Sequence, residues 1–183
     1  PYARLTRVQR DIPADNIEAG VWKSNLRQLA EKKLEEKNWT CNGIRSREIG
    51  RVDSTPNDID INNYQYQSAG GTENFISIDG VDNDAIIGFC RLRFPNEPHR
   101  KELQNAAIVR ELHIYGNETA IGDSNEKDWQ HQGFGEQLMN KAEDISRNNV
   151  YNKLSVISGI GAREYYLNHL NYERDGVYVS KKL

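Results

Sequence analysis

The sequence contains few of the residues on which disulfide-rich and zinc-binding proteins depend. Among its 183 residues are only two cysteines, Cys41 and Cys90, which lie far apart. Neither belongs to a Cys-x-x-Cys motif or a Cys/His cluster, so we expect no metal site, no disulfide scaffold and a reducing compartment. A cytoplasmic location is therefore predicted, with the nucleus as the alternative.

Long apolar runs and an excess of charge of one sign are also missing. No apolar stretch approaches the roughly 20 residues that cross a bilayer, so no membrane partner is expected. The first residues, Pro1 to Arg7, lack the apolar segment of a secretion signal. Lys and Arg number 24 and Asp and Glu 27, a net charge of −3. Bulk charge alone therefore does not predict nucleic-acid binding, although a local basic patch stays open.

What the sequence does contain fits one folded domain. Hydrophobic residues make up 37% of the chain and include nine tyrosines, enough for a core. Residues 22–37 carry apolar side chains at helical spacing and predict a leading helix. We divide the chain into a helical N-terminal extension, residues 1–50, and a core, residues 51–183.

Strand and helix patterns in the core predict the α/β (α+β) class. Segments 73–79, 85–94 and 106–115 are rich in β-branched and aromatic residues and predict an antiparallel meander, preceded by a polar loop at 51–63. The later predicted elements are a polar loop at 116–129, an amphipathic helix at 134–147, a strand at 153–157, a short helix at 163–169 and a strand at 177–183. This order indicates a mixed central sheet with flanking helices.

A glycine-containing motif stands at the start of the amphipathic helix. It has the form Gln-x-x-Gly-x-Gly over residues 130–135. Glycines let a ligand approach the backbone, and the free amides of a helix N-terminus attract anionic oxygens such as those of a pyrophosphate. No Gly-Lys-Ser/Thr follows, which disfavours a nucleoside triphosphatase. The alternative is a glycine-rich loop that only starts a helix.

A second motif follows the strand at 153–157. Residues 158–166 contain Gly159 and Gly161 and end in the pair Tyr165 and Tyr166. A dinucleotide-binding unit is disfavoured because Glu164 replaces its third glycine and too little chain follows. For the tyrosines, the alternative to a functional role is core packing.

Together the two motifs, in this order after a meander, resemble the GNAT acetyltransferase fold. More closely, the chain resembles the C-terminal acetyltransferase domain of the catalytic subunit of Elongator. The matching blocks are Arg7–Pro13, Arg47–Gly50, Gly70–Glu73, Ile87–Arg93, Ile108–Gly116, Gln130–Gly135 and Val156–Gly161. They extend over nearly the whole chain in the family's order.

This resemblance implies an enzyme that uses acetyl-coenzyme A to modify C5 of the wobble uridine in tRNA. The implied partners are tRNA and either Elongator-type subunits or a radical S-adenosylmethionine domain. The sequence has no Cys-rich iron–sulfur motif, so we expect neither an iron–sulfur cluster nor an S-adenosylmethionine site in this chain. Two alternatives stay open: protein lysine acetylation, and a module that binds acetyl-coenzyme A or tRNA without catalysis.

Carried over residue by residue, the resemblance also implies a site. The strand that pairs with the cofactor arm is Glu111, Leu112, His113 and Ile114, and the pyrophosphate turn is Gln132, Gly133, Phe134, Gly135 and Glu136. Tyr166, with Tyr165 as the alternative, is expected near the thioester sulfur, where it protonates the departing thiolate. A tyrosine hydroxyl has an ordinary pKa of about 10 and a free thiol one of about 8.5.

The general base is not identified by the sequence. We expect Glu111 and His113 to point to opposite faces of their strand, so that only one faces the cofactor. Glu73 is a third candidate, and a water-mediated or unassisted path is equally open.

The strand arginines Arg91, Arg93 and Arg110 have two interpretations. They form either a face that contacts tRNA phosphates or a set of salt-bridged side chains.

One departure from the family lies near the C-terminus. Asn171 stands where a glycine is expected, and one extra residue separates Tyr166 from Tyr172. Because Asn tolerates the left-handed conformation, we expect the turn to survive.

Overall fold

The computed structural model of the chain describes residues 1–5, 13–20, 22–23, 25–52, 55–116 and 133–183. Residues 117–132 lie outside this part. They include Gln132 of the first motif and all of the predicted loop at 116–129 except its first residue. The chain divides into two compact units, Pro1–Arg47 and Glu48–Leu183. The assignment of residues 1–50 to an extension and 51–183 to a core stays a prediction.

The first unit is helical. It contains a short 3-10 helix, Ala14–Asn16, then α1 (Leu26–Glu36) and α2 (Ile44–Arg47). The predicted leading helix is present but begins at Leu26 rather than residue 22, and none of its residues is fully buried. The Ile44 amide donates a hydrogen bond to the Ala3 carbonyl at 3.0 Å, which ties the N-terminal residues to α2.

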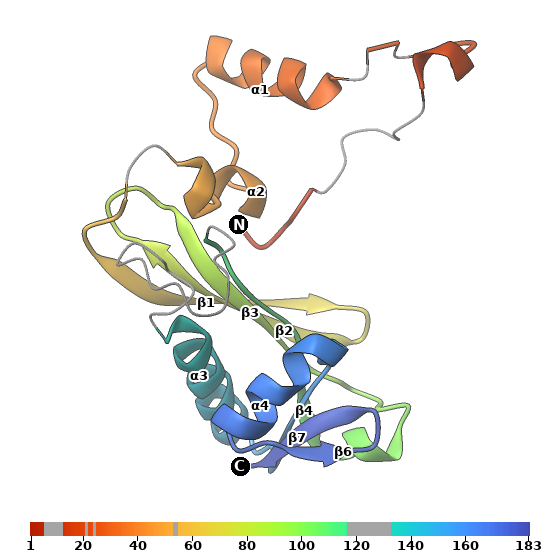
Figure 1. Cartoon of the computed structure of the whole chain (residues 1–183), viewed down its shortest axis with the longest axis vertical. Coiled ribbons are helices and arrows are strands. Elements are labelled where there is room, and N and C mark those ends of the chain that lie inside the picture. Colours follow the sequence, from red (N-terminus) through yellow and green to blue (C-terminus); the bar gives the residue numbers. More distant parts are fainter. Residues whose placement is uncertain (6–12, 21, 24, 53–54, 117–132) are drawn as a thin grey trace. The chain divides into compact units, whose positions relative to one another are not determined.

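The second unit is built on a seven-stranded sheet of order β1-β2-β3-β4-β5-β7-β6 (Figure 1). Its strands are β1 (Ile59–Ser68), β2 (Gly71–Gly80), β3 (Ile86–Phe94), β4 (Ala106–Ile114), β5 (Lys153–Val156), β6 (Glu173–Asp175) and β7 (Tyr178–Lys182). Its longer helices are α3 (Phe134–Asn148) and α4 (Arg163–His169), and its 3-10 helices are Ile49–Arg51, Lys101–Leu103 and Ile160–Ala162. Only β4 and β5 pair in parallel, so the sheet is mixed, and the predicted fold class and β2-β3-β4 meander are confirmed.

Two strands differ from the sequence prediction. The predicted loop at 51–63 is wrong for residues 59–63, which belong to β1 and pair with β2 along its full length. As an edge strand with one solvated face, β1 needs few apolar residues, and Ile59 and Ile61 supply its contacts with the core. The other addition, β6, is only three residues long, too short to show a period.

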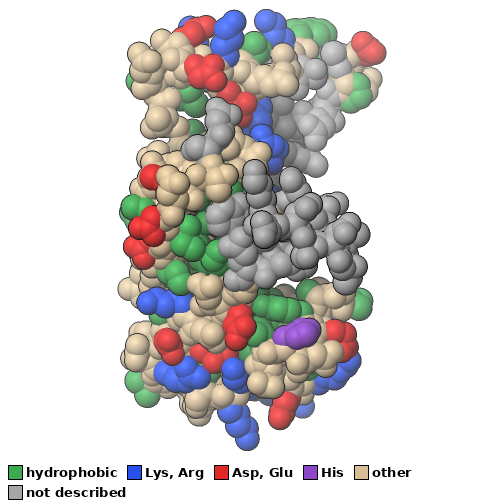
Figure 2. Space-filling view, turned by 60° about the vertical axis from the view of Figure 1, so that its left-hand side comes forward, with side chains coloured by type: hydrophobic (Ala, Val, Ile, Leu, Met, Phe, Trp, Pro, Cys, Tyr) green, Lys and Arg blue, Asp and Glu red, His purple; other side chains and the backbone are tan. Residues whose placement is uncertain are grey.

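Helix α3 covers one face of the sheet, where it contacts β2, β3 and β4. Its predicted apolar stripe is confirmed, with Phe134, Leu138 and Ala142 buried in the main core. Tyr166 and Leu170 of α4 join the same core. No helix in the described part of the chain is long and apolar enough to span a membrane. On the surface shown in Figure 2, acidic and basic side chains are interspersed rather than gathered by sign.

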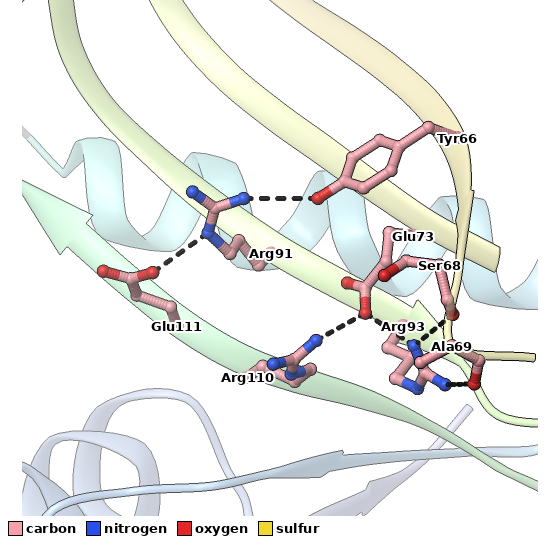
Figure 3. Close-up of polar contacts among 8 residues, drawn as sticks. All are labelled: Tyr66, Ser68, Ala69, Glu73, Arg91, Arg93, Arg110 and Glu111. Atoms are coloured by element: carbon pink, nitrogen blue, oxygen red, sulfur yellow. Dashed lines mark hydrogen bonds and ion pairs between the residues drawn. The ribbon is translucent and has the colours of Figure 1, made fainter. Parts of the chain in front are cut away.

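The other face of the sheet carries a polar cluster (Figure 3). The Glu73 side chain is only 2% exposed, and its Oε1 accepts hydrogen bonds from Arg93 Nη1 at 2.8 Å and Arg110 Nη1 at 2.5 Å. Alongside, Arg91 Nε donates to Glu111 Oε2 at 3.0 Å. All three arginines are therefore ion-paired, as one interpretation predicts, and contact with tRNA phosphates stays a prediction.

The cluster lies at a bulge in β4. Arg91 pairs with Glu111, but the next residue, Leu92, pairs with Val109, so Arg110 is an extra residue in β4. A bulge of this kind breaks the strict alternation of faces. Arg110 and Glu111 are neighbours in sequence, yet both reach acidic or basic partners on the face opposite α3.

We expect the Glu73→Gln substitution to lower the free energy of unfolding by about 1–3 kcal/mol, because two arginines lose their buried counter-charge. The loss stays moderate because solvent reaches the Arg110 side chain, which is 47% exposed. Urea denaturation measures it. The control is Asp144→Asn, which removes an exposed ion pair with Arg147 and should cost less than about 0.5 kcal/mol. Equal losses in both variants would contradict a special role for Glu73.

The end of α4 accommodates the extra residue noted in the sequence. Asn171 has φ +58°, the left-handed conformation expected of it. The Tyr172 amide donates to the Tyr166 carbonyl at 3.1 Å. This bond spans six positions, one more than the outer bond of a Schellman motif. The inserted residue is thus absorbed in a wider turn.

Replacing Asn171 should therefore depend on backbone conformation alone. We expect Asn171→Ala to destabilise the protein by about 1 kcal/mol, because an alanine is strained at positive φ. Asn171→Gly should stay within about 0.5 kcal/mol of the parent. Thermal unfolding of both variants checks the pair, and an alanine variant as stable as the glycine variant would contradict the argument.

Candidate active site

The site is built where β4 and β5 part. The two strands pair from Ala106↔Lys153 to Val109↔Val156, and the Ile157 amide donates the last bond to the Val109 carbonyl at 2.9 Å. Beyond this point β4 continues beside β3 as far as Ile114. Within the described residues, no strand pairs with the other edge of Glu111–Ile114. Backbone groups along a strand edge are obligatory hydrogen-bonding groups, so this edge can bind a ligand that offers amides.

Helix α3 begins with a glycine in the left-handed conformation. Gly133 has φ +74° and serves as the N-cap, without a side-chain cap among the described residues. Its carbonyl accepts the first helical bond, from the Gln137 amide at 3.1 Å. The amides of Phe134, Gly135 and Glu136 therefore precede the helical hydrogen-bond ladder. Amides in this position, with the positive end of the helix dipole, attract anionic oxygens.

Tyr165 of α4 lies against this first turn of α3. A Cβ atom built on Gly135 would lie 2.8 Å from the Tyr165 hydroxyl oxygen and 4.0 Å from Leu112 Cδ2. Position 135 therefore accommodates only a glycine without displacing Tyr165. The contact brings together three residues from α3, α4 and the unpaired half of β4.

The two tyrosines of the pair have different surroundings. Tyr166 is 5% exposed and packs in the main core, where burial first, then Cys90 and Tyr165, raise its pKa. The pKa of Tyr165 is raised by partial burial and by the carboxylate of Glu136. Both hydroxyls keep their proton at neutral pH, but it is Tyr165 that contacts the start of α3.

Glu111 and His113 lie on the same face of β4, so the prediction that they point to opposite faces is wrong. Glu111 binds Arg91, and the His113 ring stacks on Phe89 with 5.9 Å between centroids. Residues two apart in a strand share a face. Leu112 and Ile114 point the other way and pack against the main core.

The candidate bases and the buried thiol differ in how they are held. Glu73 and Glu111 are both paired with arginines, so each carboxylate already accepts a hydrogen bond from a guanidinium. Burial, with a smaller contribution from Glu111, raises the pKa of Cys90 to about 12, so its thiol is a poor nucleophile. In the described part of the chain, no group of three or more His, Cys, Asp or Glu side chains could hold a metal ion.

Sequence reasoning missed the contact of Tyr165 with Gly135 and the cavity on the opposite face, which Arg110 lines. The family's glycine pattern could have indicated the first, because a glycine two residues into a helix suggests close approach of another group. No local sequence pattern indicates the cavity, because the position of Arg110 in it depends on the bulge in β4.

Comparison with known proteins identifies the family. The model of the Acetyltransferase (GNAT) family matches residues 40–172. The chain belongs to this family. Its fold agrees with that of a solved structure, the archaeal Methanocaldococcus infernus Elp3 with an N-terminal deletion, with a TM-score of 0.87 at 44% identity. That match covers 97% of this chain and 44% of the other. The predicted GNAT fold is confirmed.

Curated relatives of this GNAT chain are longer proteins. It is 44% identical to the tRNA uridine(34) acetyltransferase of Methanocaldococcus infernus and 40% identical to Elongator complex protein 3 of Saccharomyces cerevisiae. Each match covers 100% of this chain but only 36% and 34% of those proteins, respectively. The chain thus spans about a third of their length, and the predicted resemblance to the Elongator catalytic subunit is confirmed.

The first turn of α3 can be tested with Gly133→Glu. We expect this variant to lose binding of acetyl-coenzyme A, because the new side chain is strained at φ +74° and repels an anionic ligand. Isothermal titration calorimetry measures the affinity. Gly133→Asn, which tolerates positive φ and is neutral, is the matched control and should retain most of it. Unchanged affinity in the Glu variant would show that the ligand binds elsewhere.

Proposed function

We propose that the chain is an acetyl-coenzyme A-dependent acetyltransferase domain that acts on the wobble uridine of tRNA. The observation that carries the proposal is the parting of β4 from β5 after Val109, next to a helix that begins at the left-handed Gly133. The names of two relatives, tRNA uridine(34) acetyltransferase and Elongator complex protein 3, support tRNA as the substrate.

The residues present fit acetyl-coenzyme A. The amides of Phe134, Gly135 and Glu136 would bind the diphosphate, since they stand at the start of α3. The free edge of β4 at Leu112–Ile114 would pair with the amides of the pantetheine arm. At Gly133, a Cβ atom would meet no described atom within 4 Å, so the backbone of this turn is open to a ligand.

When bound, acetyl-coenzyme A supplies an acetyl group activated as a thioester. Tyr165 is the side chain best placed to assist, since its hydroxyl lies beside Gly135 in the first turn of α3. Complete proton transfer from a phenol to a thiolate is uphill by about 1.5 pKa units, or about 2 kcal/mol. The raised pKa of Tyr165 adds to that cost. Tyr165 therefore stabilises the leaving sulfur chiefly by donating a hydrogen bond.

The remaining chemistry at C5 of uridine lies beyond these residues. Forming a bond to that carbon would need the radical S-adenosylmethionine domain that the resemblance implies. In the proposed division of labour, this chain would bind the thioester and cleave its C–S bond. When the other domain is absent, the acetyl group would pass to water as acetate and coenzyme A would leave as its thiol. Lysine acetylation needs the ammonium to lose its proton. Of the three candidate bases, Glu73 and Glu111 are held by arginines and His113 stacks on Phe89, so we do not favour this function.

Thiol release from acetyl-coenzyme A separates the possible functions. It is measured with tRNA, with a lysine-containing peptide and with neither. Stimulation by tRNA alone supports the proposal, and stimulation by the peptide alone supports protein acetylation. Cofactor binding without release under any condition would identify a non-catalytic module. The full-length relative, with its additional domain, serves as the positive control.

We expect Tyr165→Phe to slow tRNA-stimulated thiol release by about 10- to 100-fold, because the hydrogen bond to the leaving sulfur is lost. The affinity for acetyl-coenzyme A should not change. Tyr151→Phe is the matched control, because Tyr151 is also partly buried with a raised pKa but packs on Phe94. A slow Tyr166→Phe variant beside a fully active Tyr165→Phe variant would instead assign the role to Tyr166.

A further inference from the structure

A cavity of about 670 Å³ lies on the face of the sheet that α3 does not cover. Arg93 and Arg110 line it, whereas their strand neighbours Leu92 and Val109 belong to the main core beneath α3. Figure 3 shows both arginines in the polar cluster around Glu73. The cavity is also lined by Ile108 and Ile157, which flank the point where β4 and β5 part.

The floor of this cavity carries a net positive charge. Two arginines share one carboxylate, Glu73, which leaves one positive charge uncompensated. Arg93 is more fully engaged than Arg110, because it also donates to the carbonyls of Ser68 at 3.0 Å and Ala69 at 2.8 Å. Glu97 lines the cavity too, but it is exposed, and solvent screens its charge.

Arg110 is the group that can bind a ligand. Within the described residues its guanidinium bonds only to Glu73, through Nη1, and its side chain is 47% exposed. No described residue occupies its other nitrogens, which can donate to an acceptor in the cavity. Glu73 fixes the guanidinium in place, so little side-chain freedom is lost on binding. A planar guanidinium held in this way matches a phosphate group, with which arginine forms two parallel hydrogen bonds.

We propose that this cavity is the acceptor site of the domain and that it takes a phosphate-bearing nucleotide through Arg110. The inference rests on the proposed function. Ile108, Arg110 and Ile157 line the cavity, so it adjoins the point where β4 leaves β5. An acceptor held there would approach a thioester on the free edge of β4 from the face opposite α3. Leu103, Ile108 and Tyr178 form an apolar cluster on this face, against which a base can pack. The positive floor attracts a phosphate and repels a lysine ammonium, so its charge favours a nucleotide over a lysine as the acceptor.

The test compares Arg110→Gln with a matched control, Arg147→Gln. Arg147 is 45% exposed and pairs with Glu143, a glutamate that is 5% exposed, so it reproduces the setting of Arg110 at another place. In the Arg110 variant, the KM for tRNA in thiol release should rise about 10-fold, the loss of one charge-assisted contact. The slope of log affinity against log salt should fall by about one. Arg147→Gln should leave both unchanged.

Arg110→Lys and unfolding curves separate a binding role from a folding role. The lysine keeps the charge but not the paired hydrogen bonds, so it should restore the salt slope and only part of the affinity. A wild-type KM and salt slope in a folded Arg110→Gln protein would overturn the proposal. The proposal would also be overturned if the unfolding midpoint of Arg110→Gln fell together with its affinity for tRNA, and if both recovered together in Arg110→Lys.

Direct binding of fluorescent single-stranded RNA, measured by anisotropy, distinguishes failure of the nucleotide site from failure of the proposed function. If the wild type binds RNA through Arg110 but does not bind acetyl-coenzyme A, the proposed function fails and the nucleotide site stands. If it releases thiol but Arg110→Gln binds RNA normally, only the site fails. Inorganic phosphate could occupy the same site, so its binding is measured separately. Saturation of the Arg110 site by phosphate with no RNA binding would overturn the assignment to a nucleotide.

Discussion

A buried carboxylate shared by two arginines organises the centre of the sheet. Glu73 on β2 binds Arg93 on β3 and Arg110 on β4, so a single charge links three neighbouring strands. Arg110 is also the extra residue of the bulge, and β4 leaves β5 directly before it. The bulged residue has no opposite partner in the ladder, and its ion pair with Glu73 ties it to β2. The free edge of β4 thus begins next to a residue that is held from the other side of the sheet.

In the proposed function, one face of the sheet binds the cofactor and the other face binds the acceptor. On one face α3, α4 and Leu112 bring amides and the Tyr165 hydroxyl together beside the free edge. On the other, the cavity at Arg110 offers positive charge and an apolar wall. The strands part between the two, so a thioester and an acceptor can meet without a helix standing between them. Specific contacts of this kind, rather than net charge, would carry RNA recognition in a chain of net charge −3.

Sequence patterns predicted the elements with strong local periodicity and missed those without it. The stripe of α3 and the runs of β2, β3 and β4 were identified because many residues of one kind recur at a fixed period. The polar edge strand β1 and the three-residue β6 carry no such signal. The expectation for Glu111 and His113 was wrong even by strand geometry, and the bulge at Arg110 placed a further residue on their face.

By itself, the sequence determined the family, the order of the elements and the left-handed positions that only certain residues tolerate, such as Asn171. These follow from local preferences and from spacing along the chain. The tertiary structure alone decided which tyrosine meets Gly135 and which arginine keeps free donors in the cavity. Such pairings join residues from different strands and helices, and their distances depend on the packing of the whole sheet, which no local window of sequence contains.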